Sequence, residues 1–313
     1  MSGDASGEIA GLRAVLNACY AVCIDRLWLH REMIGHVYIC EGGGKRYVLK
    51  RYRPIETENA LRSIEILQYL KQQDYPVVTI VPTRSGASHC MMDTPQGPSV
   101  GILFDYLDGP EPERDAEVAA IARQVGRLHQ VMEAYPQPLL RRGKDFYVDR
   151  YIAILQALDY PAGRIDDLAA YGGECWSRIE RLPAGFCHGD LHTGNMRRLA
   201  QGRYVLFDFD AASRTHALID IATLCDASDF NRFDEAAYDR TLRVFERFYQ
   251  GYRCEREISD AEAAAIFDFI PVRHYELIAT ITQCRGETLS GAFLDEQYDW
   301  LMRWRDLCER RGR

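Results

Sequence analysis

The segment Gly109-Pro110-Glu111-Pro112 separates two parts of the chain whose hydrophobic patterns differ. Two prolines and a glycine so close together disrupt both helix and strand. Before this segment, short apolar and β-branched runs bounded by Pro and Gly indicate strands, with a helical pattern inserted among them. After it, helical spacing predominates. The pattern predicts an α+β protein with a small, strand-rich domain at 1–108 and a larger, mostly helical domain at 109–313.

Strands are expected in the first part at 33–40 and 46–51, joined by a glycine-rich turn at 41–45, and then at 76–82 and 99–106. A loose polar tail at 1–7 precedes an amphipathic helix over 14–24. A second helix, at 58–72, repeats four apolar residues at helical spacing, which are Leu61, Ile64, Leu67 and Leu70.

Seven stretches of the second part have helical patterns, at about 115–134, 145–158, 166–181, 217–226, 234–250, 259–285 and 293–310. Residues 195–209 are the exception, because two short strand-like runs flank a turn at 200–203.

Composition excludes several classes of protein. The 313 residues are 47% hydrophobic and 27% charged, as in an ordinary globular protein. The formal charge is −8 and no long basic run occurs, so a general nucleic-acid binder is excluded. No stretch reaches the roughly 18 to 20 apolar residues of a membrane span. Ten cysteines without a CxxC pair argue against zinc-ribbon and redox motifs, and we expect a reducing, cytoplasmic location.

The densest polar motif runs from His188 to Asn195 and is followed by an apolar strand that ends in Asp208-Phe209-Asp210. Carboxylates beside a core are costly unless something compensates their charge. A divalent cation that bridges polyphosphate oxygens would do so. Asp190 can accept a proton from a hydroxyl group, while Asn195 and Asp208 can hold Mg²⁺. These roles predict phosphoryl transfer to a hydroxyl acceptor.

Other interpretations of these motifs fit less well. A lone His-Gly-Asp is commonly a turn, but the complete set of polar residues goes beyond a turn. A binuclear metallophosphatase needs an upstream Asp-x-His pair, which the chain lacks. Gly42-Gly43-Gly44-Lys45 joins two strands and is not followed by Ser or Thr and a helix, so it is a turn and not a P-loop. Lys50 ends an apolar strand, from which its ammonium can reach nucleotide phosphates.

The order of these motifs resembles the aminoglycoside phosphotransferase and choline kinase superfamily, whose members are relatives of protein kinases. Segments 47–54, 101–109, 188–195 and 270–277 are most similar to the spore coat protein S (CotS) group. The stress-response kinase A and homoserine-kinase-like branches are close alternatives. The resemblance covers about 25–285 and implies a bilobal, protein-kinase-like fold with a small antiparallel sheet and a larger helical lobe.

The resemblance also implies a role for each residue of the motifs. Asp190 is the catalytic base, and His188 orients the loop by hydrogen bonds. Lys50 binds phosphates, and the hinge at Phe104–Leu107 binds adenine through the backbone of Asp105 and Leu107. Metal ligands are Asn195 and Asp208, with assistance from Asp210, and Asp220 supports the catalytic loop. The position of His192 suggests contact with solvent or substrate.

Two departures from the family pattern stand out. Kinases pair the strand lysine with a helix glutamate, but the corresponding position is Ser63, in the middle of the apolar helix face, while Glu65 lies nearly opposite. We predict that the usual ion pair is missing or is supplied by another acid. Between Trp28 and Tyr38, Gly35 is the only glycine, so we expect unusual or weak ATP binding.

The sequence therefore predicts an ATP- and Mg²⁺-dependent phosphotransferase acting on a hydroxyl group, without nucleic-acid or membrane partners. The alternative is a pseudokinase that serves as a binding or coat-assembly module with a protein partner. The acceptor stays open among small alcohols, sugars, aminoglycosides and protein Ser or Thr. A cationic acceptor would use the acids Asp226, Asp229, Asp234 and Glu235, and an anionic one would use Arg273-His274.

Overall fold

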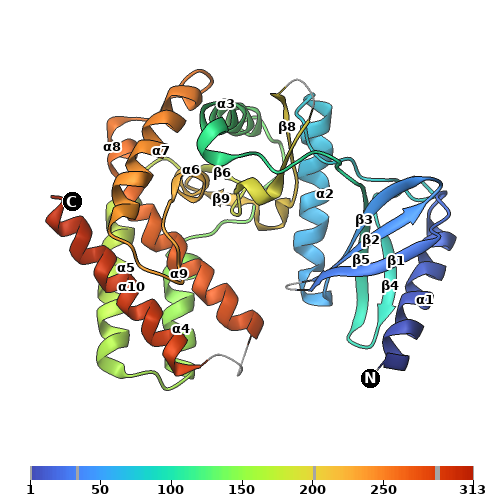
Figure 1. Ribbon diagram of the computed structural model, residues 1–313, viewed down its shortest axis with the longest axis horizontal. Helices are drawn as coiled ribbons and strands as arrows, with labels where there is room; N and C mark the ends of the chain where they lie inside the picture. The colour runs from blue at the N-terminus through green and yellow to red at the C-terminus, as the bar shows by residue number, and fades with distance from the viewer. Residues whose placement is uncertain (1, 33–34, 200–201, 286–289, 313) are drawn as a thin grey trace. The chain divides into compact units, whose positions relative to one another are not determined.

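The computed structural model describes residues 2–32, 35–199, 202–285 and 290–312. The chain divides into two compact units, whose elements are drawn in Figure 1. The first unit contains Met1–Pro110 together with Arg197–Asp210, and the second contains Glu111–Met196 together with Ala211–Arg313. Residues 197–210 thus return to the first unit, whereas the division drawn from sequence placed them after the boundary.

A five-stranded antiparallel sheet forms the centre of the first unit, in the order β1-β2-β3-β5-β4. Its strands are β1 (Arg26–Glu32), β2 (His36–Gly42), β3 (Lys45–Arg51), β4 (Cys90–Thr94) and β5 (Gly97–Asp105). Gly43 and Gly44 have φ angles of 59° and 74°, which glycine adopts readily, and they close the β2–β3 hairpin. The predicted hairpin is therefore confirmed. The strand predicted at 99–106 is confirmed as β5.

Two edge strands were missed by sequence patterns. In β1 only Leu27 is buried, and its apolar residues, Leu27 to Leu29, are too few to show the alternating pattern of a half-buried strand. The other edge strand, β4, is short. The strand predicted over 33–40 begins only at His36, and residues 33–34 lie outside the described part. The strand predicted at 76–82 is wrong, because this segment makes only isolated bridges, from Val77 to Leu206 and from Ile80 to Phe104.

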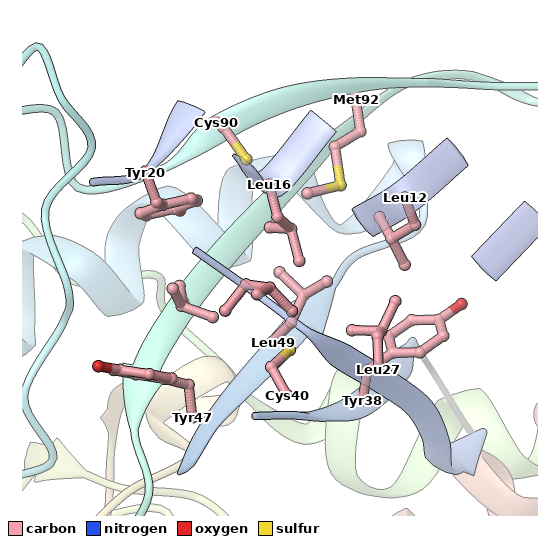
Figure 2. Close-up of a cluster of buried hydrophobic side chains, with 12 residues drawn as sticks. Leu12, Leu16, Tyr20, Leu27, Tyr38, Cys40, Tyr47, Leu49, Cys90 and Met92 are labelled. Carbon is pink, nitrogen blue, oxygen red and sulfur yellow. The ribbon is translucent and has the colours of Figure 1, made fainter. Parts of the chain in front are cut away.

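Helix α1 (Ser2–Cys19) covers the sheet of the first unit. Figure 2 shows Leu12, Leu16 and Tyr20 beside Leu49 and Cys40 of the sheet, all of them buried. The loose tail predicted at 1–7 is wrong, since residues 2–7 are helical, and the helix ends at Cys19 rather than continuing to 24. Docking against the apolar sheet explains why a segment of small residues is helical, because packing stabilises most protein helices more than propensity does.

Helix α2 (Thr57–Gln72) buries Ser63, Ile64, Ile66, Leu67 and Leu70, among others. Leu61 is 37% exposed, so its predicted burial is wrong. The buried stripe is displaced from the predicted one by about one residue and includes Ile66. A polar residue in this stripe, Ser63, satisfies its hydroxyl by donating to Ala60 O at 2.9 Å.

The second unit is mainly helical. Its longer helices are α3 (Arg114–Met132), α4 (Arg150–Ala157), α5 (Ala162–Ile179), α6 (Leu218–Cys225), α7 (Ala236–Tyr252), α9 (Ile266–Arg285) and α10 (Gly291–Arg310). These helices agree with the seven predicted ones within a few residues. The predicted helix 259–285 is divided, since α8 (Asp260–Ala264), which starts with a capping box, precedes α9.

Short strand pairs complete the fold. In the second unit β6 (Gly185–Cys187) pairs with β9 (Ser213–Thr215). The strands β7 (Met196–Arg198) and β8 (Tyr204–Leu206) form the other pair and agree with the strands predicted within 195–209. Of the turn predicted at 200–203, residues 200–201 lie outside the described part.

Two properties of the whole chain bear on the sequence predictions. No helix of the described residues is long and apolar enough to cross a bilayer. No disulfide links the ten cysteines.

Candidate active site

The segment from His188 to Asn195 leaves β6 in the second unit and ends in a short 3-10 turn, Thr193–Asn195. Gly189 has φ 83°, and a Cβ atom there would lie 2.4 Å from the carbonyl oxygen of Ala211. Both observations require glycine, because other residues adopt this φ at a cost and none would fit the space. Glycine thus lets the loop turn tightly against the start of β9.

Asp220, in the first turn of α6, is completely buried and accepts hydrogen bonds from this loop. The N–H groups of His188 and Gly189 donate to its two carboxylate oxygens at 2.7 and 2.9 Å. Burial by itself would raise the pKa of Asp220, but interactions with His129 and the loop hold it below its usual value. The geometry is that of a charged side chain that fixes the backbone of the loop.

His129 was not recognised from the sequence. It lies in α3 and is buried, with Nε2 3.1 Å from Asp220 Oδ2 and Nδ1 2.8 Å from the hydroxyl of Tyr252. Three helices thus contribute to one polar network around Asp220. A histidine on an otherwise apolar helix face is the signal that would have indicated such a buried partner.

Asp190 is 39% exposed, in contrast to the buried Asp220. Arg273 Nη2 lies 2.8 Å from its Oδ1, and His192 Nε2 lies 3.7 Å from its Oδ2. Burial by itself would raise the pKa of Asp190, but His192 and the charge of Arg273 lower it well below its usual value. Asp190 is therefore an ionised, accessible carboxylate. Its contact with Arg273 was not predicted.

Asn195 is buried and turns its amide nitrogen toward Asp190. That nitrogen donates to the backbone oxygen of Asp190 at 2.8 Å and lies 3.2 Å from its Oδ2. This orientation leaves the amide oxygen as the atom that could bind a metal. His188 is also buried and is tied to Asp220 through its backbone, which agrees with a role in the shape of the loop.

The first unit brings together a second group of predicted residues. Lys50, on β3, has its Nζ 2.6 Å from Asp208 Oδ1 and also forms an ion pair with Asp210. The hydroxyl of Tyr52, which the sequence did not single out, donates to Asp210 at 3.0 Å. Asp208 has φ 67°, a strained conformation for a residue with a side chain. These contacts link residues about 158 positions apart in the chain.

The charges of this group are unbalanced, with two carboxylates around one ammonium. Burial by itself would lower the pKa of Lys50, but the charge of Asp208 raises it well above its usual value. Burial raises the pKa of Asp210, and the charge of Asp208 adds to this although Lys50 opposes it. Two carboxylates around one ammonium leave a net negative charge, which a further cation would offset.

The prediction about the partner of Lys50 is confirmed. Glu65 is exposed on α2, and Ser63 occupies the buried face. The acids that contact Lys50 are Asp208 and Asp210. The glycine-poor loop is described only in part, since residues 33–34 lie outside the described ranges.

At the end of β5, the predicted hinge keeps its backbone accessible in part. The N–H of Asp105 donates to Thr79 O at 3.0 Å, and the N–H of Tyr106 donates to Arg46 O at 3.3 Å. Asp105 has an exposed side chain. Within the described residues, Leu107 has no backbone hydrogen bond outside helices and strands.

The residues considered for acceptor binding do not form one site. Ser228 N–H donates to Asp226, Asn231 N–H donates to Asp229, Asp234 pairs with Arg240, and Glu235 pairs with Arg310. His274 is buried, stacks on Trp300 at 4.1 Å and contacts Gln297 at 2.9 Å, so its predicted acceptor role is replaced by a structural one. Arg273 is the one of these residues that reaches Asp190.

No cluster of three or more His, Cys, Asp or Glu side chains that could hold a metal occurs in the described ranges. The donors present are an amide oxygen and carboxylates, which suit a hard cation such as Mg²⁺. Mg²⁺ in phosphoryl-transfer enzymes takes one or two protein carboxylates and completes its shell with phosphates and water. These donors therefore fit a hard cation that is bound together with nucleotide phosphates.

Comparison with known proteins identifies the family. Residues 31–258, well over half of the chain, match the model of a family described as "Phosphotransferase enzyme family". The chain belongs to this family. The phosphotransferase is 25% identical to an uncharacterized protein of Deinococcus radiodurans, over 94% of this chain and 89% of that protein. It is 26% identical to the homoserine kinase of Caulobacter vibrioides, over 73% of this chain and 72% of the kinase.

Solved structures confirm the fold of the phosphotransferase. An amicoumacin kinase, solved with AMP-PNP, Ca²⁺ and Ami, has a TM-score of 0.75 at 22% identity and covers 98% of this chain and 96% of its own. A microcompartment-associated aminopropanol kinase has a TM-score of 0.74 at 19% identity, over 96% and 97% of the two chains. The predicted kinase-like fold, with an antiparallel sheet followed by a mostly helical remainder, is confirmed.

Proposed function

We propose that this phosphotransferase transfers the γ-phosphoryl group of ATP to a hydroxyl group of a small acceptor, with Mg²⁺ as the metal. The observation that carries this proposal is the loop from His188 to Asn195. Its backbone is fixed by Asp220, and it presents Asp190 as an accessible, ionised carboxylate. Membership of the family supports the same reaction.

The reaction follows from the chemistry of these groups. The acceptor oxygen forms a bond to the γ-phosphorus while the bond from that phosphorus to the β–γ bridging oxygen breaks. ADP leaves with the bonding electron pair, and the hydroxyl proton passes to Asp190. Because the transition state is loose, Asp190 mainly orients the hydroxyl group, so its low pKa is compatible with this role.

The metal would be held by Asn195 and Asp208, with Asp210 assisting directly or through water. When bound, Mg²⁺ offsets the negative charge of the phosphate oxygens. The excess of carboxylate around Lys50 supports this assignment, since a cation would relieve the repulsion between Asp208 and Asp210. The ammonium of Lys50 would contact the phosphates, and the backbone of Asp105 and Leu107 would bind adenine.

The closer relationships predicted from sequence remain proposals. We propose that the chain is similar to the spore coat protein S group, which would imply binding to a protein partner. We also propose a cytoplasmic location. A non-catalytic binding module is the second candidate, and Ser63 in place of a glutamate partner for Lys50 favours it. The names of the homoserine, aminopropanol and amicoumacin kinases suggest homoserine, aminopropanol and amicoumacin as acceptors to test.

One experiment separates the two candidates. The purified chain is incubated with MgATP and each of five classes of acceptor, which are hydroxy acids, amino alcohols, sugars, aminoglycosides and Ser/Thr peptides. ADP formation is followed, and the phosphorylated product is identified by ³¹P NMR. We expect acceptor-dependent ADP release with one class. Failure of every acceptor, together with no binding of MgATP, would favour the binding module.

A further inference from the structure

Arg273 lies on α9 and contacts the carboxylate that we assign to the acceptor hydroxyl. Its side chain is only 15% exposed, and Nη2 is 2.8 Å from Asp190 Oδ1. One turn along the helix, Glu276 also contacts the guanidinium of Arg273. A partly buried positive charge therefore lies beside the position where the acceptor must bind.

Arg150, which lies on α4, also contacts Glu276. Its Nη2 lies 3.3 Å from Glu276 Oε1 and donates to Thr280 Oγ1 at 2.7 Å. Arg150 and Arg142 also pack on the ring of Phe146, with guanidinium carbons 4.4 and 4.1 Å from its centroid. We refer to Arg142, Arg150 and Arg273 as the arginine cluster. Within it, Arg273 contacts Asp190 and Glu276, Arg150 also contacts Glu276, and Arg142 shares the ring of Phe146 with Arg150.

The arginines of the cluster affect one another electrostatically. Burial, together with the charges of Arg142 and Arg273, lowers the pKa of Arg150 to about 10. The Nε atoms of Arg150 and Arg273 are buried and have no hydrogen-bond acceptor within the described part of the chain. Buried donors without acceptors are costly, so the carboxylates of Asp190 and Glu276 do not satisfy all the donors of these two arginines.

Two of the acids considered for a cationic acceptor already have cationic partners. Asp234 and Glu235 are exposed and form ion pairs with Arg240 and Arg310. Near Asp190, the acid on the neighbouring helix is Glu276, and it already contacts both Arg150 and Arg273. The charge around the proposed reacting hydroxyl therefore favours an anion.

We propose that the arginine cluster binds an anionic group of the acceptor, so that this phosphotransferase acts on an alcohol that carries a carboxylate or a comparable anion. This inference rests on the proposed function for the reaction, but the binding preference itself requires no turnover. Guanidinium groups bind carboxylates and phosphates through paired hydrogen bonds. Since Arg273 touches Asp190, an anion held by the cluster would place a hydroxyl on the same short molecule close to that carboxylate.

Matched ligands test the charge preference directly. Hydroxy acids of two to five carbons, such as 4-hydroxybutanoate, are compared with the corresponding amides and amino alcohols, such as 4-hydroxybutanamide and 4-aminobutan-1-ol. Binding is measured by isothermal titration with Mg²⁺ and a non-hydrolysable ATP analogue present. We expect at least one hydroxy acid to bind about tenfold or more tightly than its amide and its amine, a difference of about 1.4 kcal/mol.

Hydroxyalkyl phosphates form a further set of ligands. Tighter binding of 3-hydroxypropyl phosphate than of any hydroxy acid would assign phosphate as the anion and would support the cluster as its site. Equal binding of acids and amides, tighter binding of amines, or no binding by any anion in these series would overturn the proposal. Turnover is measured in parallel, so a lack of phosphorylation despite anion binding would contradict the proposed reaction alone.

Variants that remove a positive charge and variants that remove a negative charge distinguish anion binding by the cluster from a purely structural role. Arg273→Gln should weaken binding of the preferred hydroxy acid by about tenfold or more, and Arg142→Gln should act in the same direction. Glu276→Gln should strengthen it, because the variant removes a competing carboxylate. Arg240→Gln, an exposed arginine of the same unit, is the matched control. Weakening by Glu276→Gln as much as by Arg273→Gln, with the fold checked by circular dichroism, would contradict the inference.

Discussion

Asp190 lies in the candidate loop and Asp220 contacts its backbone, but the two carboxylates have different surroundings. Asp220 is completely buried and accepts hydrogen bonds from the backbone, whereas Asp190 is 39% exposed and contacts a guanidinium group. Both have lowered pKa values, so both carry charge at neutral pH. At the scale of the residue, burial therefore distinguishes Asp220, which holds the backbone of the loop, from Asp190, which is accessible to a substrate.

Asp190→Asn should abolish turnover while leaving nucleotide binding nearly unchanged. The change removes the group that accepts the hydroxyl proton, and loss of such a group typically lowers the rate by about 10²- to 10⁴-fold. Turnover is measured by ADP release and MgATP affinity by isothermal titration. Asp234→Asn, an exposed acid of the same unit, serves as the control. Turnover within a few-fold of the parent would disprove the assignment.

Asp220→Asn should lower both stability and turnover. The new amide cannot accept from both N–H groups of the loop, and a buried donor left without an acceptor costs about 1–3 kcal/mol. Chemical denaturation measures the free energy of unfolding. Asp239→Asn, which changes an exposed acid on α7, should stay within about 0.5 kcal/mol of the parent. Equal stability of the two variants would show that Asp220 does not hold the loop.

At the scale of the element, the position of each helix depends on the face that it buries. Helix α1 is docked by Leu12 and Leu16 against the sheet of the first unit, although its first residues are small and polar. Helix α9 is different, because it has apolar residues on most sides and contacts α4, α5 and α6. It also carries Arg273, so packing of α9 determines where the guanidinium group lies.

Leu16→Ala should destabilise the first unit by about 2–5 kcal/mol, because it removes buried apolar atoms and leaves a cavity. Urea denaturation followed by tryptophan fluorescence and circular dichroism measures the loss. Leu61→Ala is a matched control on α2, and its cost should be much smaller because Leu61 is 37% exposed. A larger loss from Leu61→Ala would show that the packed face of α2 is the one predicted from sequence.

His274 on α9 should make the second unit sensitive to acid. Burial lowers its pKa to about 3, whereas the unfolded value is about 6.5. As pH falls below about 6.5, the unfolded state binds the proton first, so the free energy of unfolding decreases by up to about 1.4 kcal/mol per pH unit. Denaturation at pH 7.5 and 5.0 measures this decrease.

His274→Gln should reduce the loss of stability between these two pH values, while His30→Gln, on the mostly exposed strand β1, should not. An unchanged pH dependence in the His274 variant would assign acid sensitivity to other groups.

At the scale of the whole molecule, the residues that we assign to the reaction belong to both units. Lys50, Asp208 and Asp210 belong to the first unit, while Asp190 and Asn195 belong to the second. Because carboxylates outnumber ammonium groups around Lys50, ATP without Mg²⁺ would meet repulsion there. Nucleotide and metal should therefore bind together.

MgATP should stabilise the chain much more than ATP with EDTA does. At a concentration 100 times its dissociation constant, a ligand stabilises the folded state by about 2.7 kcal/mol. Differential scanning fluorimetry measures the shift of the melting temperature. Lys50→Met should reduce the shift, and Lys71→Met, on the last turn of α2, is the control. The absence of any shift with MgATP would support the non-catalytic alternative.

Local patterns in the sequence determined the helices of the second unit, the β2–β3 hairpin and the candidate loop from His188 to Asn195. Periodicity and turn residues act between neighbours in the chain, so they can be recognised without the fold. The position of Ser63 on the buried face of α2 was predictable for the same reason. The edge strand β1 was not predictable from such a pattern, because its side chains are mostly exposed.

Only the tertiary structure decided which charges meet. Lys50 contacts acids about 158 positions away, and Arg273 contacts Asp190 across 83 positions. No local pattern specifies such pairs, since they depend on how helices and strands pack. The sequence by itself determined which residues we propose for phosphoryl transfer. The fold decided that Arg273 contacts Asp190 and that Arg273 and Arg150 share Glu276, because packing of α4 and α9 brings these side chains together.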